Sequence, residues 1–223
     1  MASNQPIPAA EQTRAALIQA ALRLFGEKGY DGTSTREIAG AARANIGSIA
    51  YHFGGKEGLR AACAEFIVET VQSVADQALG PQPAAAQAAD PETAQRILSA
   101  GIERMVDFIV ARPESGAFVQ FILRELAHPT AALDRIYSGV FEPTHRRFCQ
   151  LWERATGEPA EDERTKLTVF TMIGQVVYFR IGREAVMRRM GWSGIGPAEA
   201  GKIVATARFN LDAVLAARGR EKQ

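Results

Sequence analysis

The sequence is poor in cysteine and histidine and carries almost no net charge. Its 223 residues include two cysteines and three histidines, and 26 Lys and Arg against 25 Asp and Glu give a formal net charge of +1. This balance excludes nucleic-acid binding through bulk charge, so any basic surface must be local. Cys63 and Cys149 have no partner at metal-ligand spacing, which favours reduced thiols in a cytoplasmic protein.

Long hydrophobic runs and targeting signals are also missing. No stretch approaches the roughly 18 apolar residues that suggest a membrane-spanning helix. Residues 1–10 contain two prolines and lack the charged-then-apolar order of a signal peptide, so we expect a flexible tail there. The sequence has no Gly-rich phosphate loop and no nucleophile beside an identifiable base. We therefore expect neither an enzyme nor a cofactor, and a cytoplasmic protein without membrane contact.

Helical periodicity runs along most of the chain. Apolar residues recur three and four positions apart over about 11–28 and 56–79, and no long segment alternates as a strand would. Residues 80–91 hold three prolines and no periodicity, which predicts a linker loop. The chain is therefore expected to be all-α, with a DNA-binding part at 11–55, a connecting helix at 56–79 and a C-terminal domain at 92–223. Helices of that domain are expected near 92–111, 115–127, 130–156, 161–190 and 197–218, the third kinked at Pro143.

A pair of short helices is predicted near the N-terminus. Ser34, followed three residues later by Glu37, has the pattern of a capping box and opens a helix that ends near Arg43. Asn45 is expected to cap the next helix, which Phe53 closes. Because only about three residues separate the two helices, the spacing is that of a helix-turn-helix, whose second helix lies in the DNA major groove.

The second helix of this pair carries small residues where bulk is usual. Gly47, Ser48 and Ala50 would let its axis approach base edges, and Ile46 could touch a thymine methyl group. Tyr51 and His52 at its end could reach phosphates, as could Lys56 with the free N–H groups at the start of the next helix. The alternative interpretation is a tight helical hairpin in which these side chains only cover a surface.

The segment "GYDGTSTREIAGAARANIGSIAYHFGGKEGL" resembles the DNA-binding region of the TetR family of bacterial transcriptional regulators. The chain departs from the family pattern at Arg43, where a glycine is usual, and at Ala50, where an aromatic residue is frequent. The turn at Arg43 must therefore use another conformation or be assisted by Asn45. The pieces that carry the resemblance are Phe25, Gly29-Tyr30, Arg36-Glu37-Ile38-Ala39, Gly47, Tyr51-His52-Phe53, Lys56-Glu57 and Leu59.

This resemblance implies a homodimer, a near-palindromic double-stranded operator, a helical ligand-binding C-terminal domain and, usually, repression. The stretches "ILRELAHP", "GVFEPTHRRF" and "GQVVYF" resemble the CerR-type C-terminal branch of the family. The residues expected to bind DNA are Ser34, Arg36, Asn45, Ile46, Gly47, Ser48, Ala50, Tyr51, His52 and Lys56.

Aromatic side chains are spread over the predicted C-terminal helices, where they could line a ligand pocket or only fill a core. A mostly apolar pocket with a few polar anchors would take an apolar or aromatic effector. The residues expected to bind it are Phe108, Phe121, Arg124, Glu125, His128, Tyr137, Phe141, His145, Gln175 and Tyr178.

Two Glu-x-x-His patterns offer an alternative function. Glu125 with His128 and Glu142 with His145 could, with further glutamates, form a metal centre in a helical bundle, as a metal-binding protein or metal sensor. A proline directly after the first pattern and another inside the second weigh against it. No metal ligand is therefore assigned.

The last two predicted helices carry apolar faces that could form a dimer interface or only the core of one chain. In the family, such a pair meets its mate in a four-helix interface, and Gly174 would allow close approach. The first face consists of Val169, Met172, Ile173, Val176 and Val177, and the second of Ile203, Val204, Ala207, Leu211 and Val214.

Overall fold

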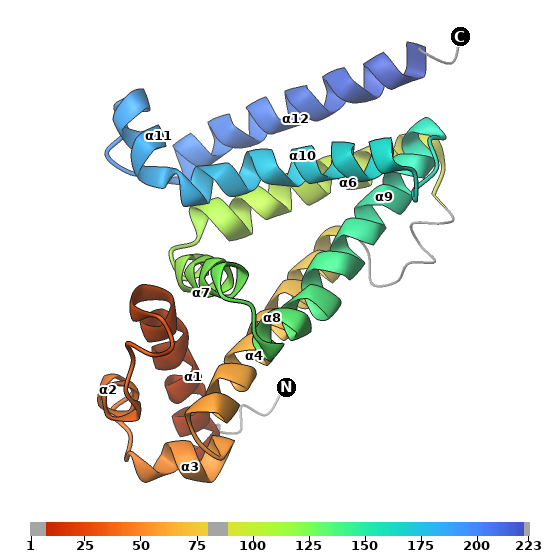
Figure 1. Ribbon diagram of the computed structural model, residues 1–223. Coiled ribbons are helices and arrows are strands. Elements are labelled where there is room, and N and C mark those ends of the chain that lie inside the picture. Colours follow the sequence, from red (N-terminus) through yellow and green to blue (C-terminus); the bar gives the residue numbers. More distant parts are fainter. Residues whose placement is uncertain (1–7, 80–88, 221–223) are drawn as a thin grey trace, which may run out of the picture. The chain divides into compact units, whose positions relative to one another are not determined.

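The computed structural model describes residues 8–79 and 89–220, and every regular element within these ranges is a helix (Figure 1). The prediction of an all-α fold is confirmed. The chain forms two compact units: one comprises Met1–Glu69 and Ala117–Tyr137, the other Thr70–Gly116 and Ser138–Gln223. The domain boundaries expected from the sequence follow chain order, whereas each compact unit combines segments that are distant in sequence.

The first unit holds the predicted pair of short helices. Its fully buried large side chains are apolar, and α1 packs against α2 and α3. Ala9 and Ala10 already belong to α1, so the tail expected over residues 1–10 is wrong at these positions, and residues 1–7 lie outside the described part. Its elements are α1 (Ala9–Lys28), α2 (Thr35–Ala41), α3 (Gly47–Phe53), the first part of α4 (Lys56–Leu79), most of α7 (Ser115–Ala127), and α8 (Ala131–Ile136).

Helix α7 packs against α1 within this unit. Phe121 is 1% exposed, and its ring centroid lies 6.4 Å from that of Phe25. A Cβ atom at Gly26 would lie 2.9 Å from a side-chain carbon of α7, so glycine permits the close approach of the two helices. Arg124 donates hydrogen bonds to the carbonyls of Gly26 and Glu27. Because carbonyls in the last turn of a helix lack intrahelical donors, Arg124 caps α1.

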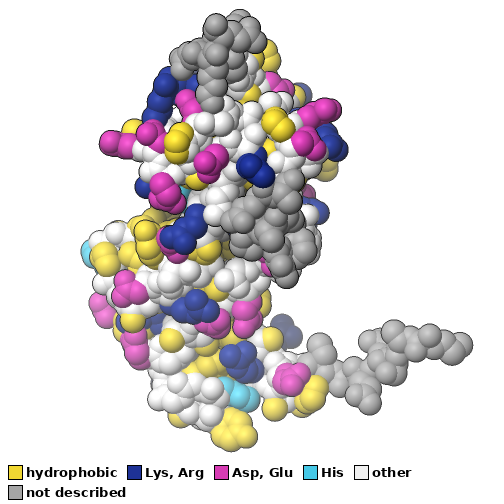
Figure 2. Space-filling view, turned by 90° about the vertical axis from the view of Figure 1, so that its right-hand side faces the viewer, with side chains coloured by type: hydrophobic (Ala, Val, Ile, Leu, Met, Phe, Trp, Pro, Cys, Tyr) yellow, Lys and Arg dark blue, Asp and Glu magenta, His cyan; other side chains and the backbone are white. Residues whose placement is uncertain are grey.

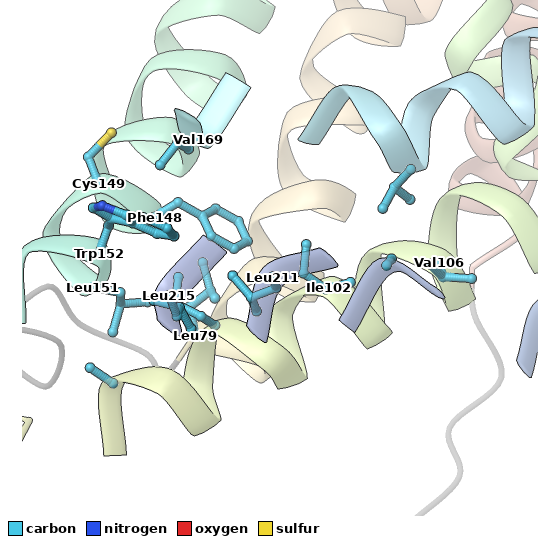
Figure 3. Close-up of a cluster of buried hydrophobic side chains, with 14 of the residues drawn as sticks. Leu79, Ile102, Val106, Phe148, Cys149, Leu151, Trp152, Val169, Leu211 and Leu215 are labelled. Atoms are coloured by element: carbon cyan, nitrogen blue, oxygen red, sulfur yellow. The ribbon is translucent and has the colours of Figure 1, made fainter. Parts of the chain in front are cut away.

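The second unit is built around a cluster of buried apolar side chains (Figure 3). Helix α6 packs against α9, and α10 packs against α9 and α12. Figure 3 shows Phe148, Trp152, Ile102 and Leu211 converging from these helices. The elements are the rest of α4, α6 (Pro91–Met105), η1 (Val106–Ala111), η2 (Tyr137–Phe141), α9 (Glu142–Thr156), α10 (Glu163–Ile181), α11 (Arg183–Met190) and α12 (Pro197–Arg220).

Two segments, η1 and η2, are wound as π-helices. The single helix expected over 130–156 is therefore divided into α8, η2 and α9. Pro143 is the second residue of α9, which follows η2 directly. The helix expected over 161–190 is also wrong, because it breaks at Gly182, and glycine has a low helix propensity. Residues 80–88 of the expected linker lie outside the described part, and α6 begins at Pro91.

The two thiols are buried, one in each unit. Burial raises the pKa of Cys63 far above its ordinary value and that of Cys149 to about 11. Both thiols are therefore protonated near neutral pH, and both cysteines are free.

No helix within residues 8–79 and 89–220 combines the length and the hydropathy that a membrane span requires.

Candidate nucleic-acid interface

Helix α2 begins with the capping box that the sequence predicted. The backbone N–H of Glu37 donates to the Ser34 hydroxyl at 3.1 Å, and the backbone N–H of Ser34 donates to the Glu37 carboxylate at 2.8 Å. The Ser34 hydroxyl hydrogen is also donated to this carboxylate, at 2.8 Å. A hydroxyl contact from Ser34 to a phosphate would have to replace this bond, so the structure favours a role for Ser34 in holding α2.

The turn after α2 is a Schellman motif. The N–H of Ala44 donates to the carbonyl of Ala39 at 2.9 Å, and the N–H of Arg43 donates to that of Gly40 at 3.1 Å. Arg43 has a φ of 52°, in the left-handed region. For a residue with a Cβ atom this conformation costs about 1–2 kcal/mol. The chain thus keeps the geometry that glycine normally supplies, and the expectation of another conformation at Arg43 is wrong.

Helix α3 is fixed at both ends by short-range hydrogen bonds. The N–H of Gly47 donates to the Asn45 side chain at 2.8 Å, so Asn45 stabilises the start of α3. Assistance from Asn45 was one of the two expectations stated for this turn. At the other end, Gly54 adopts a left-handed φ of 72° and its N–H donates to the carbonyl of Ala50. These bonds explain why a helix of only seven residues can stand between two turns.

One side of α3 is buried and the other faces outward. Ile49 is 2% exposed, whereas Ile46 is 49% and Tyr51 82% exposed. An outward face that combines large exposed apolar groups with glycine and alanine is unusual for a surface helix, and it is the face expected to lie against the bases. Of the other expected contacts, Ser34, Arg36, Asn45, Gly47 and Ala50 are exposed, and Ser48, His52 and Lys56 are half-buried.

The first turn of α4 is held by Tyr30, to which the sequence analysis assigned no role. Lys56 Nζ and Arg60 Cζ each lie 4.1 Å from the centre of the Tyr30 ring. Burial and a hydrogen bond to Glu57 raise the pKa of the Tyr30 phenol. Glu57 also pairs with Arg60 at 2.6 Å, so Lys56 keeps its charge available beside the corner between α3 and α4.

The cations of the first unit fall into two groups. Lys28 pairs with Glu37, Arg60 with Glu57, and Arg135 with Glu65. At the height of α3, the space-filling view shows a histidine side chain beside basic and hydrophobic ones (Figure 2). Any basic footprint on this surface is local, in keeping with the neutral overall charge. From α1 to α4, the described cations that form no ion pair are Arg14, Arg36 and Lys56 on helices and Arg43 in the turn between α2 and α3.

Arg14 and Arg43 were not among the expected contacts. The Arg14 guanidinium carbon lies 5.6 Å from the centre of the Phe53 ring, at the end of α3. No local pattern links position 14 to position 53, so sequence reasoning had no signal for this contact. For Arg43 the signal was present, because the sequence already showed an arginine where the family pattern has glycine.

We expect Glu37→Gln to remove part of the acid sensitivity of the first unit. The hydrogen bond from Lys28, followed by those from Ser34, lowers the pKa of Glu37 from 4.5 to about 2. A lowered folded-state pKa gives a contribution to stability that is complete above pH 4.5 and is lost as the pH falls toward 2. Circular dichroism during acid titration should show the wild type losing its advantage over the variant in that window. If the acid-unfolding curves of the wild type and Glu37→Gln have the same shape, the lowered pKa of Glu37 does not contribute to stability.

Comparisons with known proteins agree with this geometry. A family model described as "Bacterial regulatory proteins, tetR family" matches residues 17–63, and one described as "HTH-type transcriptional dual regulator CecR, C-terminal domain" matches residues 94–218. The dual regulator CecR of Shigella flexneri is 35% identical over 213 residues, which cover 92% of each chain. This chain belongs to the TetR family. Its C-terminal half is of the CecR type, which corrects the name CerR used for this branch above.

Solved structures of TetR proteins share the fold. A TetR-like transcriptional regulator from Rhodococcus sp. RHA1 gives a TM-score of 0.63 at 20% identity and covers 98% of this chain and 100% of its own. A regulator of the "TerR/AcrR family" from Aquifex aeolicus VF5 gives 0.56 at 19% identity, over 91% and 99%. The family model and the relative from Shigella flexneri identify a TetR-family transcriptional regulator, and α2 and α3 lie within the matched segment with helix-turn-helix spacing.

Several residues expected to bind an effector have structural partners in the first unit of this TetR protein. Phe121 fills its core and Arg124 caps α1. Glu125 is 6% exposed and accepts a hydrogen bond from the Thr130 hydroxyl at 2.5 Å. The remaining expected residues in this unit, His128 and Tyr137, are exposed.

The other expected effector residues lie in the second unit. The His145 ring stacks on Phe170 with a centroid distance of 3.9 Å, and Gln175 accepts a hydrogen bond from Asn210. Phe108 is buried and Phe141 half-buried, while Tyr178 is exposed. Tyr178 also lines a largely apolar cavity of about 470 Å³ formed with Phe179, Ala185, Val186, Arg189, Met190, Trp192, Lys202, Ile203 and Thr206.

The metal-binding alternative finds no support. Glu142 pairs with Arg146, and His145 Nε2 lies 3.1 Å from the carbonyl oxygen of Lys166. Glu125 is occupied by Thr130. Among the residues that the structure describes, no group of three or more His, Cys, Asp or Glu side chains is placed to hold a metal ion.

The apolar faces expected at a dimer interface belong instead to the core of the second unit, where Val169, Val176, Ile203 and Leu211 are buried. These residues thus follow the alternative interpretation, a core within one chain. A second apolar surface remains outside. We call it the outer stripe; it consists of Leu167, Phe170, Tyr178 and Ile181 on α10 and Phe209 on α12, each between 53% and 71% exposed.

Proposed function

We propose that this regulator is a cytoplasmic, ligand-responsive repressor that binds a near-palindromic operator as a homodimer. The observation that carries the proposal is the outward face of α3, with Ile46 and Tyr51 exposed beside cations that have no carboxylate partner among the described residues. A dimer would place two copies of α3 in successive major grooves, about 34 Å apart.

Each exposed group of the helix-turn-helix has a distinct role in this proposal. Ile46, Gly47, Ser48 and Ala50 face the base edges, where the small side chains permit close approach. Phosphates are bound from both ends of the motif and set its register on the duplex. The phosphate contacts are Arg36, Tyr51, His52 and Lys56, with Ser34 and Asn45 holding the two helices that carry them.

We expect Lys56→Ala to weaken binding to every DNA sequence by about tenfold and to reduce the slope of log K against log [salt] by about one. The physical reason is the loss of one phosphate contact from an ammonium that forms no ion pair with the described residues. Fluorescence anisotropy across a KCl series, on the DNA flanking the protein's own gene and on a scrambled duplex, measures both quantities. Wild type and Tyr51→Ala are run in parallel.

Two controls separate phosphate from base contacts in that experiment. Ser48→Ala should keep the salt slope and change base preference, since its hydroxyl faces the bases in the proposed complex. Arg96→Ala, an exposed cation of the second unit, should change neither. An unchanged slope for Lys56→Ala would show that its phosphate role is wrong.

The outer stripe supports a homodimer. Its α10 residues recur three, eight or eleven positions apart and thus share one helical face, and a Cβ atom at Gly174 within it would meet nothing within 4 Å. An exposed apolar face of this kind marks an interaction surface. A second copy of the chain can cover it with the same face, as two-fold symmetry requires.

Phe209→Glu is expected to weaken dimerisation by at least about tenfold, because it would bury an unpaired carboxylate in the interface. Sedimentation equilibrium should show a monomer at concentrations where the wild type is dimeric, together with weaker operator binding. Leu126→Glu serves as the matched control, because Leu126 is 49% exposed on α7, outside the outer stripe. Unchanged association of Phe209→Glu would remove this face as the interface.

The proposed effector is an apolar or aromatic compound bound in the C-terminal helices. The apolar cavity beside Tyr178 and the aromatic side chains of the second unit support this class of ligand. A screen for compounds that release operator DNA in the anisotropy assay tests the response. Because the relative from Shigella flexneri is described as a dual regulator, a reporter gene should be followed for both loss and gain of expression.

A further inference from the structure

We propose that Arg43, in the turn between α2 and α3, binds a DNA phosphate and is an additional contact of this helix-turn-helix. The proposal rests on the proposed function, because it adds a residue to the same DNA-binding surface. It identifies the partner of Arg43 as the sugar-phosphate backbone beside the groove that α3 enters.

The backbone at this position calls for a residue other than arginine. The hydrogen bonds from Ala44 to Ala39 and from Arg43 to Gly40 close the turn, and this closure requires the positive φ of 52° at Arg43. Glycine adopts this conformation without steric cost, and asparagine does so more easily than arginine. Arg43 is the one residue other than glycine with a positive φ over residues 8–79 and 89–220. The turn itself therefore gives no reason for an arginine.

The Arg43 side chain makes no compensating polar contact with the described residues. Arg43 is exposed, and over the described residues it forms no hydrogen bond through its side chain and no ion pair. The carboxylate of Glu37, on the preceding helix, is already bonded to Lys28 and Ser34. Residues held in such sparsely populated conformations cluster at binding and active sites, which motivates an external partner for Arg43.

The position and chemistry of Arg43 favour a phosphate. It precedes Ile46, the start of the outward face of α3, by three residues, and three trans peptide units place their Cα atoms no more than about 11 Å apart. A guanidinium presents five donors in a planar fork that matches two phosphate oxygens. Such a contact adds affinity for all sequences and carries no base preference of its own.

The test compares Arg43→Gly, Arg43→Lys and Lys56→Ala with the wild type by fluorescence anisotropy, on the operator fragment and on a scrambled duplex across a KCl series. Arg43→Gly should bind both duplexes about tenfold more weakly, with a salt slope smaller by about 0.9. Arg43→Lys should keep the slope. The melting temperature of Arg43→Gly should equal or exceed that of the wild type, because glycine relieves the strain. Arg23→Ala, which removes an exposed arginine of α1 paired with Glu27, is the matched control.

The outcomes separate this inference from the proposed function. If Lys56→Ala lowers the slope and Arg43→Gly changes neither slope nor affinity, Arg43 is a tolerated surface residue and only the inference is overturned. If Arg43→Gly lowers the affinity for the operator fragment alone and leaves the salt slope unchanged, Arg43 contacts a base and the proposed phosphate contact is overturned. A lower melting temperature of Arg43→Gly would show that the arginine stabilises the turn. If the wild type binds neither duplex, both the proposed function and the inference are overturned.

Discussion

Gly58→Ala should weaken operator binding by at least about tenfold and destabilise the first unit by about 1–3 kcal/mol. A Cβ atom at Gly58, in the first turn of α4, would lie 1.8 Å from the carbonyl oxygen of Phe53, the last residue of α3. A backbone atom cannot rotate away as a side chain can, so α3 and α4 must move apart. The corner that they form carries Tyr51, His52 and Lys56, three of the proposed phosphate contacts.

Gly40→Ala is the matched control for this prediction. Gly40 lies in α2, and a Cβ atom there would meet nothing within 4 Å. Alanine should therefore raise stability by about 0.5–1 kcal/mol through its higher helix propensity and leave DNA binding within about twofold. Thermal unfolding and anisotropy measurements on both variants decide the outcome. Equal binding by the two variants would show that the corner between α3 and α4 does not position the DNA contacts.

Phe121→Ala is expected to lower the free energy of unfolding by about 3–5 kcal/mol, because the change leaves a cavity in a fully packed core. The ring of Phe121 is 1% exposed and lies against Phe25 of α1. Although Phe121 lies far outside the segment that matches the TetR DNA-binding domain, we expect its loss to weaken operator binding as well. The reason is that α1 supports α2 and α3 from within the same unit.

Urea unfolding followed by circular dichroism measures this change, with Leu126→Ala as the control on the same helix. Leu126 is 49% exposed, and its truncation should change stability by no more than about 0.5 kcal/mol. Hydrogen exchange in α1 should be faster in Phe121→Ala than in the control. Unchanged exchange in α1, with a normal loss of global stability, would show that α7 does not support the DNA-binding helices.

The helix-turn-helix could be predicted from the sequence because the interactions that form it are local. Ser34 and Glu37 cap α2 across three residues, and Asn45 binds the backbone of Gly47 two residues away. Gly54 ends α3 in the conformation that glycine favours. Each of these signals can be read in a short window of sequence, and the contacts that they predict are present.

The apolar face of α10 shows where such reasoning stops. Periodicity indicated apolar residues along this helix, but two apolar faces are present, one containing Val169 and Val176 and the other Leu167 and Tyr178. Which of them lies inside depends on how α9 and α12 pack against the helix. Contacts between distant segments determine which face is buried, and they also determine the partners of Tyr30 and Arg124. No local sequence pattern predicts these contacts.

The discontinuous first unit limits how this regulator can be recombined with others. A hybrid that joins residues 1–79 to a foreign effector domain would leave Phe25 without Phe121 and the end of α1 without its cap from Arg124. Because the chain passes between the units three times, at 69–70, 116–117 and 137–138, no single junction exchanges one unit intact. Engineered sensors based on this protein therefore need to retain residues 117–137 together with the helix-turn-helix. Natural recombination of DNA-binding domains among such regulators faces the same restriction.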